Sequence, residues 1–429
     1  MTAFQDADFA VALLDADRSR LEGEHGVGAQ MAMSIVARMA DVLGATALLD
    51  ITAAHIDSAL FLGDATLEYA EHLAQGGASV VVPTTLNVSG VEEQGWRRWA
   101  VSADWAAKAQ RQMRAYEQMG CKPTYTCAPY QTEERPAFGQ QIAWGESSAI
   151  VFANSVLGAR TERYPDLFDI CAAITGRVPA VGLHLEENRR GQVLIQIGRL
   201  PDRLRRNDAL YPVLGHLIGR EVADRVPVID GLEVDPTEDQ LKALGAAMAS
   251  SGAVALFHLV GVTPEAPTAN QAFQGYAPER TVEIDLGAIR AARDDLSSAS
   301  DGALDMVVLG SPHFSLEEFQ RLARLVQGRQ RDPKVRFLVT TSRAVAMIAK
   351  RAGSIDAVLS FGGEIMVDTC ILTSPVLGDD VRTLMTNSAK FAYYTPGLLD
   401  RGMVFGALED CVNSAERGRI ERDDSLWHP

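Results

Sequence analysis

The sequence lacks the features of a secreted or membrane-spanning protein. Its first twenty residues contain no basic segment followed by an apolar run, so we expect no ordinary secretory signal. No stretch reaches the roughly 18 uninterrupted apolar residues of a membrane span. The 429 residues include only 5 cysteines, too few for a disulfide framework in a chain of this length. Such thiols suit core packing, metal ligation or nucleophilic chemistry in a reducing compartment. We therefore expect a cytoplasmic protein that makes no membrane contact.

Basic residues are also in the minority. The formal net charge of −16 opposes the basic surface on which nucleic-acid binding depends. The GxGxxG, Walker, HExxH and GxSxG motifs are absent, so nucleotide-binding, zinc-protease and serine-hydrolase functions have no support. What the chain does have is an ordinary globular composition, with 47% apolar and 22% charged residues. Its length exceeds one typical core and predicts two or three domains.

Short β-branched segments alternate with longer helical ones, which predicts a mainly parallel α/β architecture. The predicted strands are 45–52, 78–83, 123–129, 148–156, 180–185, 193–197, 253–260, 281–285, 306–309, 335–340 and 357–360. The predicted helices are 28–43, 66–75, 105–119, 238–250, 286–296, 316–325 and 343–352. An irregular middle section suggests three α/β domains, approximately 1–135, 136–275 and 276–429.

Three cysteines lie beside strand-like segments, where α/β proteins place their sites. Cys127 precedes a proline-containing turn, Cys370 follows a segment that begins with Gly362-Gly363, and Cys411 follows a short apolar run. A buried cysteine is commonly a small core residue, and single cysteines this far apart do not define a metal site by their spacing. Three converging thiolates would suit an iron–sulfur cluster with one open iron position.

Polar residues interrupt or follow several apolar segments, and buried polar groups need partners. Arg160 has the planar guanidinium that binds a carboxylate through two hydrogen bonds, although a surface arginine is an equal alternative. His258 lies inside an apolar segment and fits a core histidine. The remaining polar positions of interest are His55, Asp57, Thr85, Asn87, Glu146, Ser147, Ser148, Asn154, Thr161, His313 and Lys390.

These segments, taken in order, resemble the large subunit of the aconitase X family of hydro-lyases. The matching pieces are LEGEHG (21–26), AHID (54–57), PTTLN (83–87), TCAPY (126–130), ESSA (146–149), NSVLGART (154–161), GVTPEA (261–266), GSPH (310–313), DTC (368–370), NSAK (387–390) and DC (410–411). Each piece is weak alone, but the ordered series spans nearly the whole chain. Archaeal members carry cysteine where Ser311 stands, so the chain resembles the bacterial branch.

The resemblance implies an aconitase-like core of three α/β domains with mainly parallel sheets, lacking the swivelling small domain. It implies iron or an iron–sulfur cluster held by Cys127, Cys370 and Cys411, with 2Fe–2S favoured over 4Fe–4S or a single iron. A separate small subunit carrying the swivelling domain is then the expected partner, and a small hydroxy acid is the expected substrate.

The bacterial branch further implies dehydration of cis-3-hydroxy-L-proline to Δ1-pyrroline-2-carboxylate. For this reaction we expect Glu146, Ser147 or Ser148 to take the proton, unless the base lies on the small subunit. We expect the catalytic Lys390, together with Arg160, to hold the substrate carboxylate as charge develops. The resemblance places substrate binding on His55, Asp57, Thr85, Asn87, Asn154, Arg160, Thr161 and His313. The alternatives are a mevalonate 5-phosphate dehydratase, a cluster-carrying sensor or scaffold without turnover, and a protein whose cysteines are structural.

Overall fold

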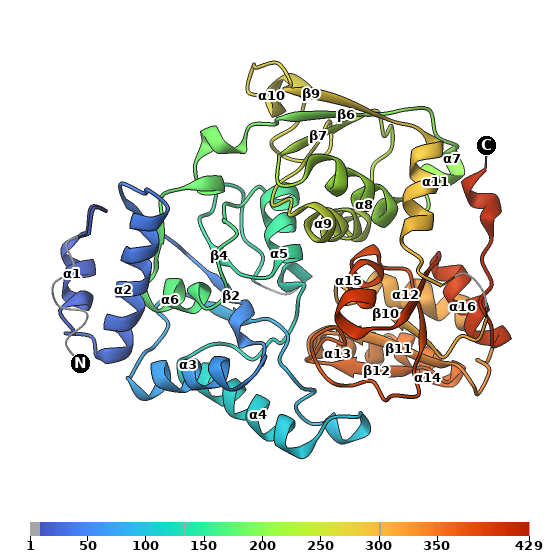
Figure 1. Cartoon of the computed structure of the whole chain (residues 1–429), viewed down its shortest axis with the longest axis horizontal. Coiled ribbons are helices and arrows are strands. Elements are labelled where there is room, and N and C mark those ends of the chain that lie inside the picture. Colours follow the sequence, from blue (N-terminus) through green and yellow to red (C-terminus); the bar gives the residue numbers. More distant parts are fainter. Residues whose placement is uncertain (1–8, 132–133, 300–301, 429) are drawn as a thin grey trace. The chain divides into compact units, whose positions relative to one another are not determined.

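The computed structural model describes residues 9–131, 134–299 and 302–428. The chain divides into two compact units, Met1–Trp96 with Val101–Arg189, and Arg97–Ala100 with Arg190–Pro429 (Figure 1). The expected boundary near 135 therefore lies inside the first unit, because residues on both sides of it pair in one sheet. The expected boundary near 275 likewise lies inside the second unit, for the same reason.

The first unit contains a small parallel sheet. Strand β2 (Ala54–Ile56) lies between β3 (Thr84–Leu86) and β4 (Ala143–Trp144), and both pairings are parallel. Strands β1 (Leu48–Asp50) and β5 (Arg177–Pro179) form a separate antiparallel pair. The helices of this unit are α1 (Asp15–Leu21), α2 (Val27–Val42), α3 (Asp64–Gln75), α4 (Ala103–Gln118), α5 (Ser147–Phe152) and α6 (Phe168–Thr175), and a π-helical turn spans Ala153–Leu157.

The first half of the second unit contains a four-stranded parallel sheet in the order β8-β7-β6-β9. Its strands are β6 (Val193–Ile197), β7 (Pro227–Asp230), β8 (His258–Leu259) and β9 (Arg280–Ile284), and its helices are α7 (Asp202–Arg205), α8 (Leu210–Val222), α9 (Glu238–Gly252), α10 (Ala269–Ala272) and α11 (Leu286–Asp295). Helices α8 and α9 approach closely, since a Cβ on Gly252 would lie 1.9 Å from the carbonyl oxygen of Gly219. Only glycine permits this contact.

The second half contains a five-stranded parallel sheet in the order β12-β11-β10-β13-β14. Its strands are β10 (Met306–Leu309), β11 (Arg336–Thr341), β12 (Glu364–Val367), β13 (Thr383–Thr386) and β14 (Gly402–Phe405), and its helices are α12 (Leu316–Val326), α13 (Arg343–Arg351), α14 (Ser354–Phe361), α15 (Ala389–Leu399) and α16 (Leu408–Arg417). Chain order runs outward from β10 in one direction and from β13 in the other. The switch point of the sheet therefore lies between β10 and β13, where ligands bind in open α/β sheets.

Five predicted strands are absent. Residues 148–156 form α5 and the π-helical turn, because the Glu146 side chain accepts a hydrogen bond from the Ala149 N–H and caps a helix there. Residues 357–360 belong to α14, which lies between Gly353 and Gly362, both left-handed. Residues 78–83 and 123–129 form no strand, and residues 180–185 contain the 3-10 turn Gly182–His184 instead of one. Short apolar segments do not by themselves distinguish a buried helix from a buried strand.

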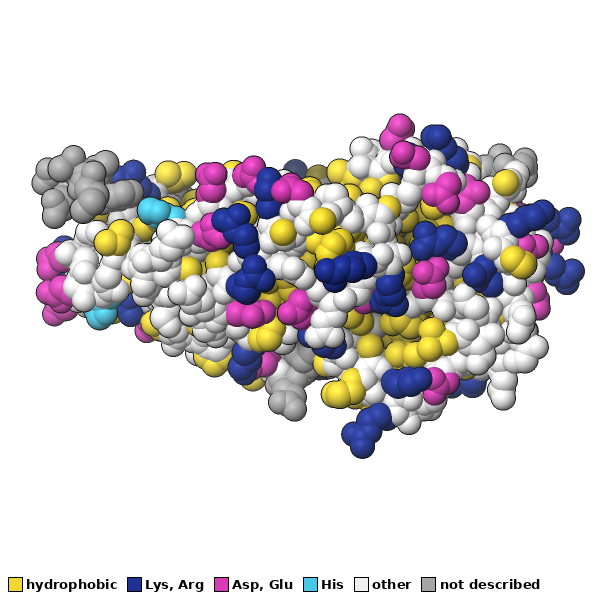
Figure 2. Space-filling model, turned by 90° about the horizontal axis from the view of Figure 1, so that it is seen from below, with side chains coloured by type: hydrophobic (Ala, Val, Ile, Leu, Met, Phe, Trp, Pro, Cys, Tyr) yellow, Lys and Arg dark blue, Asp and Glu magenta, His cyan; other side chains and the backbone are white. Residues whose placement is uncertain are grey.

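No helix in the described ranges is long and apolar enough to cross a lipid bilayer. On the face in Figure 2, acidic and basic side chains are interspersed, and no continuous basic surface covers it.

Candidate active site

Polar side chains gather where the strands of the first unit end. The three strands are parallel, so the residues that follow them, Asp57, Asn87 and Gly145, lie at the same edge of the sheet. The Asn87 side-chain N–H donates to a carboxylate oxygen of Asp57. The Asn87 backbone N–H donates to the Ile56 carbonyl over 3.0 Å. Two of the predicted binding residues, Asp57 and Asn87, are thus brought together.

Asp57 lies in a group of carboxylates. Its backbone N–H donates to Asp169 Oδ2 over 2.5 Å, and the hydroxyl of Ser58 donates to Asp169 Oδ1 over 2.6 Å. Burial raises the pKa of Asp57 to about 8, and the negative charges of Glu146 and Asp169 add to the effect. Asp57 therefore carries a proton at neutral pH, which suits a group that delivers one.

Gly145 permits this arrangement. A Cβ at this position would lie 2.6 Å from Asp169 Oδ2 and 2.8 Å from the Cβ of Asp57. Its own N–H donates to the His55 carbonyl over 2.9 Å, which continues the pairing of β4 with β2. The absence of a side chain at Gly145 thus lets Asp57 and Asp169 approach the end of β4.

Glu146 follows Gly145 and begins α5. Its carboxylate accepts a hydrogen bond from the Ala149 N–H at 2.7 Å, and the Ser147 hydroxyl lies 3.5 Å from its other oxygen. Glu146 and Ser148 are buried, with 5% and 2% of their surface exposed, whereas Ser147 is partly exposed. Of the two predicted serines, Ser147 is the more accessible to a ligand.

A buried histidine supports the segment that carries Cys127. His55 Nδ1 lies 2.8 Å from Thr85 Oγ1, and the backbone of Thr126 also interacts with the imidazole ring. Burial lowers the pKa of His55 to about 3, so the ring is neutral at neutral pH. Cys127 itself is partly exposed. His55 and Thr85 therefore lie behind the Cys127 turn as its support.

The side chain of Asn154 binds the backbone of Thr161, and both residues were predicted to bind substrate. Asn154 Nδ2 donates to the Thr161 carbonyl over 2.9 Å, and the Thr161 N–H donates to Asn154 Oδ1 over 3.1 Å. The guanidinium of Arg189 also donates to both oxygens of Asn154. With these bonds made and both side chains fully buried, their geometry favours a structural role over contact with a substrate. Arg160 forms an ion pair with Glu186.

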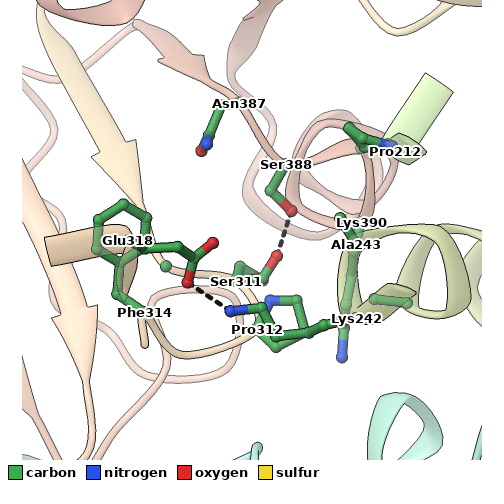
Figure 3. Close-up of a pocket in the computed structure, with 13 residues that line it drawn as sticks. Pro212, Lys242, Ala243, Ser311, Pro312, Phe314, Glu318, Asn387, Ser388 and Lys390 are labelled. Atoms are coloured by element: carbon green, nitrogen blue, oxygen red, sulfur yellow. Dashed lines mark hydrogen bonds and ion pairs between the residues drawn. The ribbon is translucent and has the colours of Figure 1, made fainter. Parts of the chain in front are cut away.

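A pocket opens at the switch point of the five-stranded sheet in the second unit (Figure 3). It encloses about 40 Å³, room for about three water molecules or one carboxylate group. The residues after β10, Ser311 and Pro312, form part of its wall, and those after β13, Asn387 to Lys390, form another part. The Ser388 hydroxyl donates to the Ser311 carbonyl and joins the two loops. The predicted Lys390 thus lines a pocket of suitable size for an anionic group.

The predicted His313 does not line this pocket but points to the Cys370 turn. Its Nε2 lies 3.3 Å from the Thr369 carbonyl oxygen, one residue before Cys370. Burial lowers the pKa of His313 to about 4. Cys370 is partly exposed, and its carbonyl accepts hydrogen bonds from the N–H groups of Thr373 and Ser374. His313 therefore supports the Cys370 turn as His55 supports that of Cys127.

Sequence inspection missed a charged cluster at the pocket. Lys242 Nζ pairs with Asp239 at 2.8 Å and with Glu318, and Lys242 and Glu318 line the pocket. Two signals were present in the sequence. Ser315 and Glu318 have the spacing of a capping box, which the structure forms. Lys242 also shares a helix face with the apolar residues Ala246 and Ala249, an unusual place for a lysine.

The cysteines differ in what they can bind. Cys127 and Cys370 are partly exposed, whereas Cys411 lies with no exposed surface among the apolar side chains of the second unit. Cys370 follows β12, but the segment before Cys127 forms no strand. Burial raises the pKa of the Cys411 thiol well above its usual value, which favours a neutral packed thiol. The described residues contain no group of three histidine, cysteine or acidic side chains arranged to hold a metal.

Family models extend over most of the chain. The models described as the first, second and third domains of aconitase X match residues 10–187, 191–294 and 304–417. The chain belongs to the aconitase X family. These domain limits agree with the division of the structure after Arg189 and differ from the limits expected at 135 and 275.

Individual aconitase X relatives agree with this assignment. The chain is 47% identical over 96% of its length to a protein named cis-3-hydroxy-L-proline dehydratase from Pseudomonas aeruginosa, of which it covers 72%. It is 38% identical to the phosphomevalonate dehydratase large subunit of Methanothermobacter thermautotrophicus, over 91% of this chain and 96% of that protein. The crystal structure of the holo-form of Thermococcus kodakaraensis aconitase X superposes with a TM-score of 0.84 at 32% identity, covering 94% of this chain and all of that one. The predicted α/β class with mainly parallel sheets is confirmed.

Proposed function

We propose that this chain is a hydro-lyase that dehydrates cis-3-hydroxy-L-proline to Δ1-pyrroline-2-carboxylate. The observation that carries the proposal is the ranking of its relatives. Two proteins with the corresponding dehydratase name are 47% and 43% identical to it, each over 96% of the chain. Phosphomevalonate dehydratase large subunits share 33% to 38%.

The charges at the pocket support the same choice. The ammonium groups of Lys242 and Lys390 are accompanied by the carboxylates of Glu318 and Asp239. Positive charge is therefore locally balanced, which suits the single carboxylate of an imino acid better than a doubly charged phosphate. In this proposal Lys390 binds the substrate carboxylate and stabilises the charge that develops beside it.

The reaction breaks the C2–H and C3–O bonds, forms a C2–C3 double bond and releases water. The resulting enamine then tautomerises to the cyclic imine. Asp57 carries a proton at neutral pH and is our candidate for the acid that protonates the leaving hydroxyl. Glu146 and Ser147 are the candidates for accepting the C2 proton, because both follow β4 at the same sheet edge. A small subunit remains an alternative source of that base.

We further propose iron or an iron–sulfur cluster as the cofactor, with Cys127 and Cys370 as ligands. Their partial exposure and their supported turns fit this role, whereas the apolar surroundings of Cys411 do not. Bound iron would supply a Lewis acid for the carboxylate and the leaving hydroxyl.

A separate small subunit is also part of the proposal. The archaeal relatives are named as large subunits, which supports a partner subunit. The two hydroxyproline dehydratases are longer single chains, of which this chain covers 72% and 70%. Co-purification of this chain with a co-expressed small subunit would support the partner, whereas full turnover by this chain alone would exclude the need for one.

The function is tested by anaerobic assay of the chain, alone and co-expressed with the small subunit, on cis-3-hydroxy-L-proline and on mevalonate 5-phosphate. We expect turnover of cis-3-hydroxy-L-proline and no turnover of mevalonate 5-phosphate. Iron content and turnover should both fall in Cys127→Ala and Cys370→Ala and should persist in Cys171→Ala, a buried helical cysteine that serves as the control. Turnover of mevalonate 5-phosphate without turnover of the hydroxyproline would overturn the proposed substrate. Activity in a protein that contains no iron would overturn the proposed cofactor.

A further inference from the structure

A buried lysine connects α9 to the segment between β10 and α12. Only 3% of the Lys242 side chain is exposed, and its ammonium pairs with Asp239 and Glu318. The same ammonium lies 3.5 Å from the carbonyl oxygen of His313. Figure 3 shows its bond to Glu318 beside the pocket. All three of the ammonium hydrogens thus have acceptors within reach.

The two carboxylates of this cluster also bind the segment directly. Asp239 Oδ2 accepts a hydrogen bond from the Ser315 hydroxyl at 2.6 Å, and Glu318 Oε2 accepts one from the Ser315 N–H at 2.8 Å. Asp239 and Lys242 belong to the part of the chain that matches the second aconitase X domain, and Ser315 and Glu318 to the third. The cluster therefore fastens residues 310–315 to a helix of the neighbouring domain in the same unit.

Stability alone gives a poor account of such a cluster. Burying an ammonium and two carboxylates has a desolvation cost that often equals or exceeds their attraction, and apolar side chains of similar volume are commonly as stabilising. A buried ion cluster does, however, fix the orientation of the segments that carry it, because each charge has to meet its partner in one geometry. The segment it fixes contains Ser311, which lines the pocket, and His313, which supports the Cys370 turn.

We propose that Lys242 is a positioning residue of the dehydratase: it holds residues 310–315 so that Ser311 and Pro312 shape the carboxylate pocket and His313 holds the Cys370 turn. The inference rests on the proposed function for its kinetic part. Its structural part, the order of the two loops, does not depend on the substrate.

Arg293 provides a matched control. It belongs to α11 of the same unit, has 10% of its side chain exposed, and pairs with Asp294 and Asp424 away from the pocket. Arg293→Met therefore removes a buried paired cation of similar burial without touching residues 310–315. A purely structural role for Lys242 predicts that Lys242→Met and Arg293→Met behave alike.

The test compares Lys242→Met, Lys242→Arg and Arg293→Met with the unmodified chain, co-expressed with the small subunit where turnover requires it. We expect Lys242→Met to lower kcat roughly 10- to 100-fold while KM changes less than about threefold. Lys242→Arg should recover part of the loss, and Arg293→Met should leave kcat unchanged. Amide hydrogen exchange in residues 310–316 and 369–375 should quicken in Lys242→Met alone.

Equal kinetics and equal exchange in the two methionine variants would overturn the proposal. Should Lys242→Met not fold, the double variant Lys242→Met, Glu318→Gln keeps the net charge of the cluster and takes its place, with the same criteria. If the unmodified chain does not dehydrate the hydroxyproline, the proposed function fails. The exchange measurement still decides whether Lys242 orders the two loops.

Discussion

His313 Nε2 lies 3.3 Å from the carbonyl oxygen of Thr369, the residue that precedes Cys370. The first unit repeats this relationship, where the backbone of Thr126, the residue before Cys127, interacts with the ring of His55. Burial lowers the pKa of both histidines, to about 4 and about 3 respectively. A neutral imidazole still donates one N–H to a carbonyl, so each ring can hold its turn without bringing a charge beside a thiolate.

We therefore predict that His313→Leu loosens the Cys370 turn. The variant loses the hydrogen bond to Thr369, so the alkylation rate of Cys370 by iodoacetamide, followed by mass spectrometry, should rise several-fold. His313→Gln retains an N–H donor and should stay nearer the unmodified rate. The alkylation of Cys127 in the same samples is the internal control, and an equal rise at both cysteines would indicate general unfolding.

The strands of the two units were only partly predictable. The parallel class follows from alternating segments, and β6, β10 and β11 lie where their β-branched residues predict them. Strand β12 was missed because its neighbour, residues 357–360, has the stronger apolar pattern and yet forms part of α14. Such short segments are decided by tertiary packing and by capping glycines rather than by propensity.

The candidate site was predictable as a set of residues but not as a set of roles. Asp57, Glu146 and Lys390 stood out because polar residues interrupt apolar segments. Asn154 stood out for the same reason, yet its amide holds Thr161 and Arg189. A sequence does not show which polar side chains already form all their hydrogen bonds within the protein. Lys242 escaped notice because its partner Glu318 lies 76 positions further along the chain.

Gly145 should not tolerate a side chain. In Gly145→Ala the new Cβ would lie 2.6 Å from Asp169 Oδ2 and 2.8 Å from the Cβ of Asp57. We expect a loss of about 1–3 kcal/mol in the free energy of unfolding and a loss of turnover. Gly397→Ala is the control, because no atom lies within 4 Å of its added Cβ and its place in α15 favours alanine. That variant should gain about 0.5–1 kcal/mol. Equal stability of the two variants, measured by urea denaturation, would contradict the close approach.

Asp57 should make stability and activity depend on pH. Its pKa in the folded protein, about 8, exceeds the ordinary value of 3.8, so the folded chain keeps a proton that the unfolded chain releases. This contribution to stability is complete below about pH 4 and is lost as the pH rises through about 8. Asp57→Asn removes the dependence. The difference in unfolding free energy between the variant and the unmodified chain should therefore shift in favour of the variant between pH 5 and pH 9, as measured by urea denaturation.

The same titration should appear in turnover. If protonated Asp57 delivers the proton to the leaving hydroxyl, kcat falls above pH 8, and Asp57→Asn shows little turnover at any pH. A variant that retains turnover, or a kcat that is level from pH 7 to pH 9, would remove Asp57 from the proton transfer and leave Glu146 and Ser147 as the groups to examine.

Cys411 and Cys370 should respond in opposite ways to replacement by alanine. Cys411 has no exposed surface and packs within the apolar core of the second unit, so Cys411→Ala leaves a small cavity and should reduce the free energy of unfolding by about 1–3 kcal/mol. Its iron content should not change. Cys370 is partly exposed in a turn, so Cys370→Ala should keep nearly full stability and lose iron. Anaerobic iron analysis paired with urea denaturation of both variants separates the two roles. If Cys411→Ala instead loses iron while its free energy of unfolding is unchanged, Cys411 is an iron ligand. A packed core thiol could not be replaced by alanine without a loss of stability.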